Sequence, residues 1–292
     1  MDWEMYPFKN ISDTARWMAY YRMMESERPD AHFHDQYARF LAGERGKEIA
    51  RSLPWGITNA WAIIVRTCVF DEIIVKTIEN HTVDTILDLG AGFDTRPYRL
   101  PLPLSLQWIE VDLPEILSEK EEKLVNEQPH CCLTRVKLDL ADVTARRALF
   151  SRLAQEARKV LVVTEGLLIY LTAEQVTALA NDLHIHFQFR WWLTDLVSPL
   201  VLRLYQLCWA SQLAHGNVFL QFAPEEGERF FCRCGWHVAE FRSTMEEASR
   251  LNREMPFGSL WQLLVSFSSK AFQETYRKMS CFLLLEQAEA WS

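Results

Sequence analysis

The chain has 292 residues, 49% hydrophobic and 24% charged, a composition that suits a compact folded unit and excludes a disordered chain. Its formal net charge of -8 argues against general nucleic-acid binding, because phosphate backbones are held by clustered Lys and Arg. No secretory signal is visible, and the apolar stretch 196–210 is too short and too interrupted to span a bilayer. We therefore expect a cytoplasmic protein with no nucleic-acid or membrane partner.

The first 82 residues have helical periodicity and almost no strand signal. Helices are predicted over 12–26, 35–41 and 58–78, the first with Ser12 as its N-cap and with Pro29 after its end. From residue 83, short β-branched runs alternate with amphipathic stretches of helical length. This alternation is typical of βαβ units and predicts a parallel sheet. The strands are predicted at 85–91, 107–113, 132–140, 160–168 and 190–197, and the helices between them at 114–128, 142–158 and 172–187.

The last hundred residues do not continue the alternation of strands and helices. Residues 199–234 are rich in large apolar groups and predict a helical cap inserted before two final strands, at 236–241 and 281–287. We therefore expect a single domain over 1–292. Its parts are a helical lid (1–82), a core (83–198), the cap (199–234) and a last segment of strands and helix (235–292).

Cysteine usage indicates neither disulfides nor a metal site. The seven Cys are an odd number without a paired framework, as expected for reduced thiols. Cys232, Cys234 and His237 lie close in sequence but lack a fourth ligand at zinc spacing, so no metal is expected.

Polar residues follow four consecutive predicted strands. In an open parallel sheet, ligands bind beyond the carboxyl ends of the strands. Gly90 begins the first turn, where a missing side chain lets the backbone approach a ligand, and Asp112 follows at the spacing of an acid that binds a ribose diol. Asp139 and Leu140 suit an amine-bearing base, and Glu165 suits a cation. Each residue alone also fits a turn or a helix cap, so the combination carries the prediction.

A nicotinamide dinucleotide is the alternative ligand for such a pattern. Thr95 stands where the third glycine of that fingerprint belongs. Asp94 stands where the pyrophosphate would meet the helix N-terminus, and its charge would repel that group. The residues therefore disfavour a phosphate-bearing cofactor.

Four ordered segments resemble the leucine carboxyl methyltransferase family, and its bacterial small-molecule O-methyltransferase branch in particular: LDLGAGFDTRPYRL, WIEVDLPEI, VKLDLAD and VTEGLLIYLT. The resemblance implies a Rossmann-like, seven-stranded class I methyltransferase sheet with an antiparallel last strand, and S-adenosyl-L-methionine as the cofactor. It assigns cofactor contacts to six residues: Arg66 (carboxylate), Gly90 (first loop), Asp112 (ribose), Asp139 and Leu140 (adenine), and Glu165 (ammonium).

Arg66 also has a structural interpretation. It lies in the apolar run AIIVRTCVF, where a buried charge requires a partner. That partner is either a carboxylate of the ligand or an acid of the protein itself.

The predicted substrate is a hydrophobic small molecule of polyketide type, methylated on a carboxyl or hydroxyl oxygen. Candidate contacts are Tyr21 and Arg22 in the lid, Trp191, and Tyr205 in the cap. The sequence identifies no catalytic base and predicts no oligomeric state. Alternatives are methylation of a protein's C-terminal carboxylate, a non-catalytic cofactor-binding scaffold and an NAD-dependent oxidoreductase.

Overall fold

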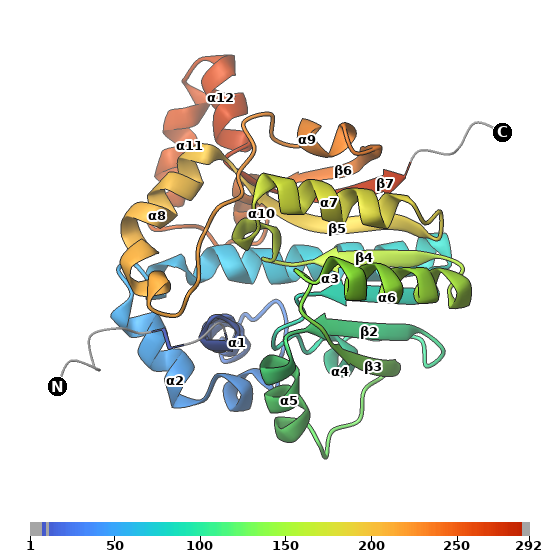
Figure 1. The fold of residues 1–292 in the computed structure, drawn as a ribbon. Helices are drawn as coiled ribbons and strands as arrows, with labels where there is room; N and C mark the ends of the chain where they lie inside the picture. The colour runs from blue at the N-terminus through green and yellow to red at the C-terminus, as the bar shows by residue number, and fades with distance from the viewer. Residues whose placement is uncertain (1–7, 10–11, 288–292) are drawn as a thin grey trace.

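A seven-stranded sheet forms the centre of the computed structural model, which describes residues 8–9 and 12–287 (Figure 1). The strand order is β3-β2-β1-β4-β5-β7-β6. β7 runs antiparallel to both neighbours, and the other pairs are parallel. The strands are β1 (Thr85–Leu89), β2 (Gln107–Asp112), β3 (Cys132–Lys137), β4 (Val160–Thr164), β5 (Phe189–Val197), β6 (Trp236–Ser243) and β7 (Ser280–Gln287). The predicted sheet with an antiparallel last strand is confirmed.

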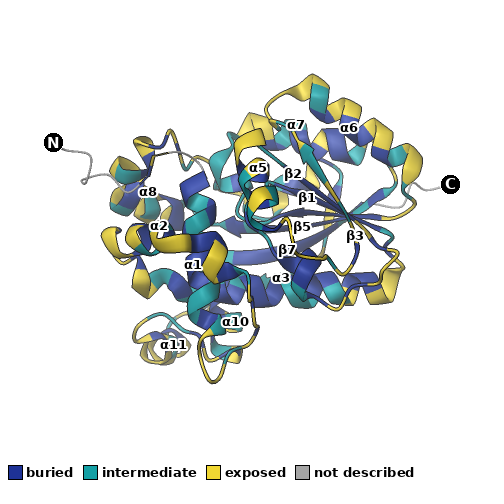
Figure 2. Ribbon diagram, turned by 90° about the horizontal axis from the view of Figure 1, so that it is seen from below, coloured by how far each residue is buried: buried dark blue, intermediate teal, exposed yellow. Residues whose placement is uncertain are grey.

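Helices cover both faces of the sheet and create two apolar cores. Successive side chains of a strand point to opposite faces, so Ile86 of β1 packs into one core and Leu87 into the other. The first core includes α1 (Ser12–Ser26), α2 (Ala38–Ser52) and α3 (Ala60–His81). The second includes α6 (Val143–Glu156) and α7 (Ala173–His184). In Figure 2 the central strands are buried accordingly, as expected for a sheet covered on both faces.

Local sequence signals explain where several helices begin. Thr172 and Gln175 form a capping box at the start of α7, each side chain bonding the other's backbone. Asp142 caps α6 by accepting a hydrogen bond from the backbone of Ala145 at 3.0 Å. A proline opens both α5 (Pro114–Lys123) and α8 (Pro199–Ala214), where its missing N–H costs no helical hydrogen bond.

Some predicted boundaries differ from the structure. α2 begins later than the predicted helix and continues to Ser52, because the chain kinks at Gly43, where φ is +56°, and then resumes a helical path. Within 199–234 only α8 and α9 (Arg229–Cys232) are α-helical. Six short helices were not individually predicted: η1 (Ile57–Asn59), α4 (Arg96–Arg99), η2 (Leu168–Tyr170), α10 (Thr244–Arg250), α11 (Gly258–Ser266) and α12 (Lys270–Arg277).

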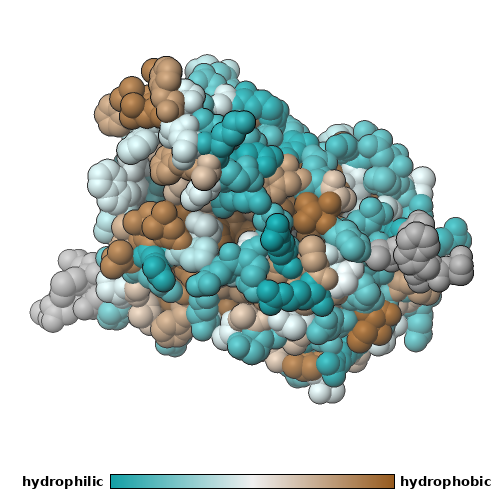
Figure 3. Space-filling view, turned by 90° about the horizontal axis from the view of Figure 1, so that it is seen from above, coloured by the Kyte–Doolittle hydropathy of each residue, from teal (hydrophilic) through white to brown (hydrophobic). Residues whose placement is uncertain are grey.

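The surface carries an apolar patch on α11. Leu260, Leu263 and Leu264 are each 55% exposed and Trp261 is 50% exposed. Figure 3 shows apolar side chains gathered on the side of the molecule where α11 lies in Figure 1. Within the described part of the chain, every helix is too short or too polar to cross a bilayer.

Candidate active site

The carboxyl ends of the central strands open into a cavity of about 240 Å³. Each of four strands contributes a carboxylate at or just beyond its end: Asp88 from β1, Asp112 from β2, Glu165 after β4 and Asp195 from β5. Helices α1, α3 and α8 supply the opposite wall. The carboxyl ends of β1, β2, β4 and β5 thus meet at one cavity, which includes three of the four strand ends predicted to form the site and leaves out that of β3.

The loop after β1 forms one end of this cavity. Gly90 and Gly92 both have positive φ, +72° and +46°, a conformation that favours glycine. The backbone N–H of Gly92 donates to Asp112 Oδ2 at 2.7 Å, and the N–H of Leu113 donates to Asp112 Oδ1 at 2.7 Å. These two bonds fix the orientation of the Asp112 carboxylate, while each oxygen keeps lone pairs for a ligand.

Asp88 lies at the floor of the same end and was not predicted. Its side chain is buried, and its Oδ2 atom has no hydrogen-bond partner among the described residues. Burial, together with the charges of Asp94 and Glu110, raises its pKa well above the ordinary value. A buried polar atom without a partner is costly, so a ligand that hydrogen-bonds Asp88 would remove that cost.

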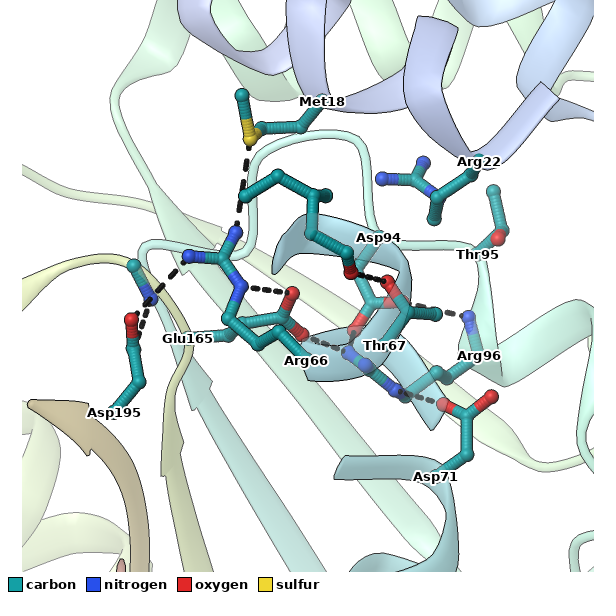
Figure 4. A network of polar contacts seen from close by, with 12 residues as sticks. Met18, Arg22, Arg66, Thr67, Asp71, Asp94, Thr95, Arg96, Glu165 and Asp195 are labelled. Atoms are coloured by element: carbon teal, nitrogen blue, oxygen red, sulfur yellow. Dashed lines mark hydrogen bonds and ion pairs between the residues drawn. The ribbon is translucent and has the colours of Figure 1, made fainter. Parts of the chain in front are cut away.

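Arg66 on α3 connects the ends of β4 and β5 (Figure 4). Its Nε donates to Glu165 Oε1 at 2.9 Å, and its Nη1 donates to Asp195 Oδ2 at 3.3 Å. Its Nη2 approaches the Met18 sulfur at 3.7 Å, in the first helix. Arg66 thus has acids of the protein itself as partners, which was one of its two expected interpretations. Its predicted contact with a ligand carboxylate stays a prediction.

Arg96 forms the second cationic centre and is only 2% exposed. Its guanidinium pairs with Asp71 at 2.6 Å, Asp94 at 2.7 Å and Glu165 at 2.6 Å. Burial alone would raise the pKa of Glu165, but the charges of Arg96 and Arg66 outweigh it and hold that pKa below the ordinary value. Glu165 is therefore ionised at neutral pH, as a residue that binds a ligand cation must be.

Asp94 occupies the N-terminus of α4. Its Oδ1 accepts a hydrogen bond from the backbone of Arg96 at 2.8 Å. Burial opposes ionisation of Asp94, but the charges of Arg96, Lys120 and Arg99 outweigh burial and lower its pKa. The helix terminus that would hold a pyrophosphate is thus filled by a carboxylate of the protein.

The structure brings seven of the ten predicted site residues to the cavity. These are Arg66, Gly90, Asp112, Glu165, Tyr21, Arg22 and Tyr205.

Two of the predicted substrate contacts in the lid already have protein partners. The Tyr21 hydroxyl donates to the carbonyl of Gly56. Arg22 Nε donates to Asp35 at 2.8 Å, and its Nη2 donates to the carbonyl of Phe93 at 2.5 Å. Arg22 thus ties α1 to the loop after β1.

Three predicted site residues do not line the cavity. Asp139 is exposed, and its Oδ1 accepts the backbone N–H of Ala141 at 2.8 Å, which is a turn role. Leu140 packs at the edge of the second core. Trp191 lies near the amino end of β5 and packs against the tilted ring of His81, with 4.7 Å between the ring centroids. Strand direction accounts for Trp191, because the cavity lies at the carboxyl end of the same strand.

Sequence reasoning missed Asp88, Arg96, Tyr170 and Asp195, all in the cavity wall. Asp195 stands near the end of β5 and could have been found by the rule that selected the other strand-end acids. Asp88 lies inside β1. Its position in the sequence shows that it is part of a strand but does not show that one of its oxygens lacks a hydrogen-bond partner.

The wall of the cavity that α1, α3 and α8 form is largely apolar. Trp17, Ile63, Tyr205, Trp209 and Leu213 line it. Tyr205 stacks on Trp209, with ring centroids 4.7 Å apart. Such a wall suits an apolar ligand with few polar groups.

Among the residues that the structure describes, His, Cys, Asp and Glu side chains form no group of three that could hold a metal ion. His184 contacts the carbonyl of Gly235 rather than the cavity. His215 is exposed on the cap.

Comparisons with known proteins show the family to which the chain belongs. The sequence pattern of the family described as leucine carboxyl methyltransferase matches residues 15–184, more than half of the chain. A protein of Parafrankia sp. (strain EAN1pec) is 32% identical over 183 residues, which are 59% of this chain and 58% of that protein. A protein of Frankia alni is 29% identical over 262 residues, 83% of this chain and 89% of that protein. Both are provisionally named S-adenosyl-L-methionine-dependent methyltransferases.

Solved structures share the fold. A DUF574 family protein from Streptomyces avermitilis superposes with a TM-score of 0.60 at 12% identity, covering 94% of this chain and 97% of that one. A provisionally named methyltransferase from Thermobifida fusca gives a TM-score of 0.56 at 13% identity, covering 96% of each chain. At such low identity these two likenesses show the fold alone.

Proposed function

Because this chain belongs to the leucine carboxyl methyltransferase family and its cofactor is S-adenosyl-L-methionine, we propose that it transfers a methyl group to an oxygen atom of a hydrophobic small molecule. One observation carries the proposal. The cavity runs without interruption from the carboxylates at the ends of β1, β2 and β4 to the aromatic wall on α8. A polar, cationic cofactor and an apolar acceptor would each meet a matching end.

The residues present fit this cofactor. Asp88 offers an unpartnered buried oxygen, and Asp112 is held in place by two backbone N–H groups. Glu165 is an ionised carboxylate that suits the ammonium group, and Arg66 suits the carboxylate of the same amino-acid moiety. The predicted adenine contacts of Asp139 and Leu140 remain part of the proposal. When bound, the cofactor supplies an electrophilic methyl group on a sulfonium centre.

The protein's own contribution is to position the groups and exclude water. Trp17 and Tyr21 of α1 are buried and line the cavity, where they would shield a bound cofactor from solvent. The carboxylates are fixed by backbone and arginine hydrogen bonds, so little reorganisation is required when charge is neutralised during transfer. A dry, preorganised cavity of this kind promotes an in-line displacement.

Calorimetry tests the cofactor-binding part of the proposal. Wild-type protein is expected to bind S-adenosyl-L-methionine, and Asp139→Ala is expected to bind it more weakly if Asp139 contacts adenine. Asp142→Ala, three residues further along, is the matched control, because Asp142 caps α6. Equal affinities for all three proteins would remove Asp139 from the cofactor site. No binding by folded wild-type protein would contradict the proposed function.

A radiolabelled-methyl screen tests the reaction. Candidate acceptors are apolar acids, phenols and alcohols, with peptides ending in a free carboxylate as the contrasting class. Label in an apolar small molecule supports the proposal, and label only in peptides would overturn it. Release of the label by mild base indicates a methyl ester, whereas stable label indicates an ether.

A further inference from the structure

Helix α11 presents an apolar stripe to solvent, away from the cavity. The stripe consists of six exposed side chains: Phe257, Leu260, Trp261, Leu263, Leu264 and Phe267. The opposite face of α11 attaches the helix to the protein, because Val265 is buried and Gln262 Nε2 donates to the carbonyl of Met245 at 3.3 Å. Figures 1 and 2 both show α11 at the edge of the molecule. The stripe is therefore open to a partner.

The size of the stripe is that of an interface. Phe257 is 78% exposed and Phe267 is 83% exposed. At about 150–250 Å² for a fully exposed large side chain, the six residues present on the order of 700 Å². The largest apolar patch on a typical monomer is about 300–600 Å². Each partner of a standard stable interface contributes about 800 Å², so the stripe can supply most of an apolar interface centre.

The stripe is symmetric about Gln262. Leu260 and Leu264 lie two residues before and after it, and Phe257 and Phe267 lie five residues before and after it. At 3.6 residues per turn, all four positions lie on the side of the helix opposite Gln262. Such a face matches a copy of itself turned through 180°. Leu260 of each copy then meets Leu264 of the other, and Phe257 meets Phe267, which is the isologous contact of a two-fold dimer.

The charges at the two ends of α11 have the same symmetry. Glu254 lies eight residues before Gln262, and Lys270 lies eight residues after it. In an antiparallel pair, the end of α11 that carries Glu254 lies beside the end of the other copy that carries Lys270. Opposite charges therefore approach each other, whereas a parallel pair would bring like charges together.

A lipid surface suits this helix less well. Helices that lie on membranes carry Lys and Arg on their polar face, whereas residues 258–266 contain no charged residue. The formal net charge of -8 also opposes contact with anionic lipids. A partner of unrelated sequence would not require the symmetry about Gln262.

We propose that α11 is the contact surface of a homodimer, in which it packs antiparallel against α11 of a second copy. The two-fold axis passes between the two helices on the side opposite Gln262. Burial of both stripes drives the association, and the paired Glu254 and Lys270 fix its direction. The inference does not depend on the proposed function.

Sedimentation velocity of the full chain at micromolar concentrations tests the assembly. Wild type is expected to sediment as a dimer. The double variant Leu260→Glu/Leu264→Glu places charges at the centre of the contact and is expected to raise the dimer dissociation constant about 100-fold or more. Its circular dichroism is expected to match wild type, because both leucines are exposed. Leu104→Glu is the matched control and is expected to remain dimeric, because Leu104 is 82% exposed but precedes β2, away from α11.

Cysteine cross-linking tests the direction of the helices, and it uses variants without an added charge. Leu260→Cys and Leu264→Cys are oxidised separately and as an equal mixture. The mixture is expected to form about tenfold more cross-linked dimer than either variant alone, because only positions 260 and 264 of different copies come within disulfide reach. Wild type measures the background from its exposed Cys132 and Cys232.

Four results would overturn the inference. One is a wild-type protein that stays monomeric at these concentrations, and another is a dimer that the double glutamate substitution leaves intact. Stronger cross-linking by either cysteine variant alone than by the mixture would exclude the antiparallel contact. Co-sedimentation of monomeric wild type with vesicles of phosphatidylcholine and phosphatidylglycerol, abolished in Leu260→Glu/Leu264→Glu, would assign the stripe to a lipid surface instead.

Discussion

Replacing Glu165 with glutamine probes the charge network that holds the site together. Glu165 accepts a hydrogen bond from Arg66 Nε at 2.9 Å and pairs with Arg96 Nη1 at 2.6 Å, and its side chain is 18% exposed. A hydrogen bond to a charged group contributes about 1.5–3 kcal/mol. Both arginines keep other carboxylate partners, and glutamine keeps one acceptor oxygen. We therefore expect the loss to lie near the lower end of the sum, about 3 kcal/mol at pH 7.

The pH dependence of this loss has a definite sign. The pKa of Glu165 in the folded protein is lowered by Arg96 and Arg66, against the opposing effect of burial. Its stabilising contribution is therefore fully present above the unfolded value of about 4.3 and disappears as the pH falls through the lower, folded pKa. The difference between wild type and Glu165→Gln is expected to be constant from about pH 7 to 5 and to shrink below about pH 4.

Urea unfolding of the cofactor-free protein at a series of pH values measures this difference directly. Glu44→Gln is the control, because Glu44 forms a surface pair with Lys47 at 3.2 Å and surface pairs contribute about 0–1 kcal/mol. The reasoning fails if Glu165→Gln is as stable as wild type at pH 7, or if the difference grows on acidification.

Three further changes have clear expected outcomes. Asp112→Ala removes the acceptor of two backbone N–H groups and is expected to weaken S-adenosyl-L-methionine binding at least tenfold by calorimetry; unchanged affinity would contradict the ribose assignment. Gly166→Ala is expected to lower the thermal midpoint more than Gly227→Ala, because both glycines have positive φ but only at Gly166 would the new Cβ lie 2.8 Å from a guanidinium nitrogen; equal midpoints would refute the predicted clash. Lys120→Met removes one of the two ion pairs of the buried Glu110, which keeps Arg135 at 2.8 Å, and is expected to cost about 1.5–3 kcal/mol in urea unfolding; an unchanged stability would contradict this expectation.

Several features of the fold and site could be predicted from the sequence because they depend on local patterns. Runs of buried residues such as TILDL, separated by amphipathic stretches, indicate strands covered on both faces. The carboxyl ends of parallel strands share one edge, so Gly90, Asp112 and Glu165 could be placed together from their positions alone. The same rule could not distinguish Asp139, whose carboxylate bonds its own turn at the edge strand β3.

The Arg66 network required the tertiary structure. The sequence showed only that a charge in an apolar helix requires a partner, and it left a ligand and an internal acid as alternatives. The structure supplies Glu165 and Asp195, 99 and 129 residues away along the chain. These pairs form because β4 and β5 are neighbours in the sheet and the N-terminal part of α3, which contains Arg66, lies at their carboxyl ends. Local patterns determine which residues are buried, but only the packing of distant elements decides which charges meet.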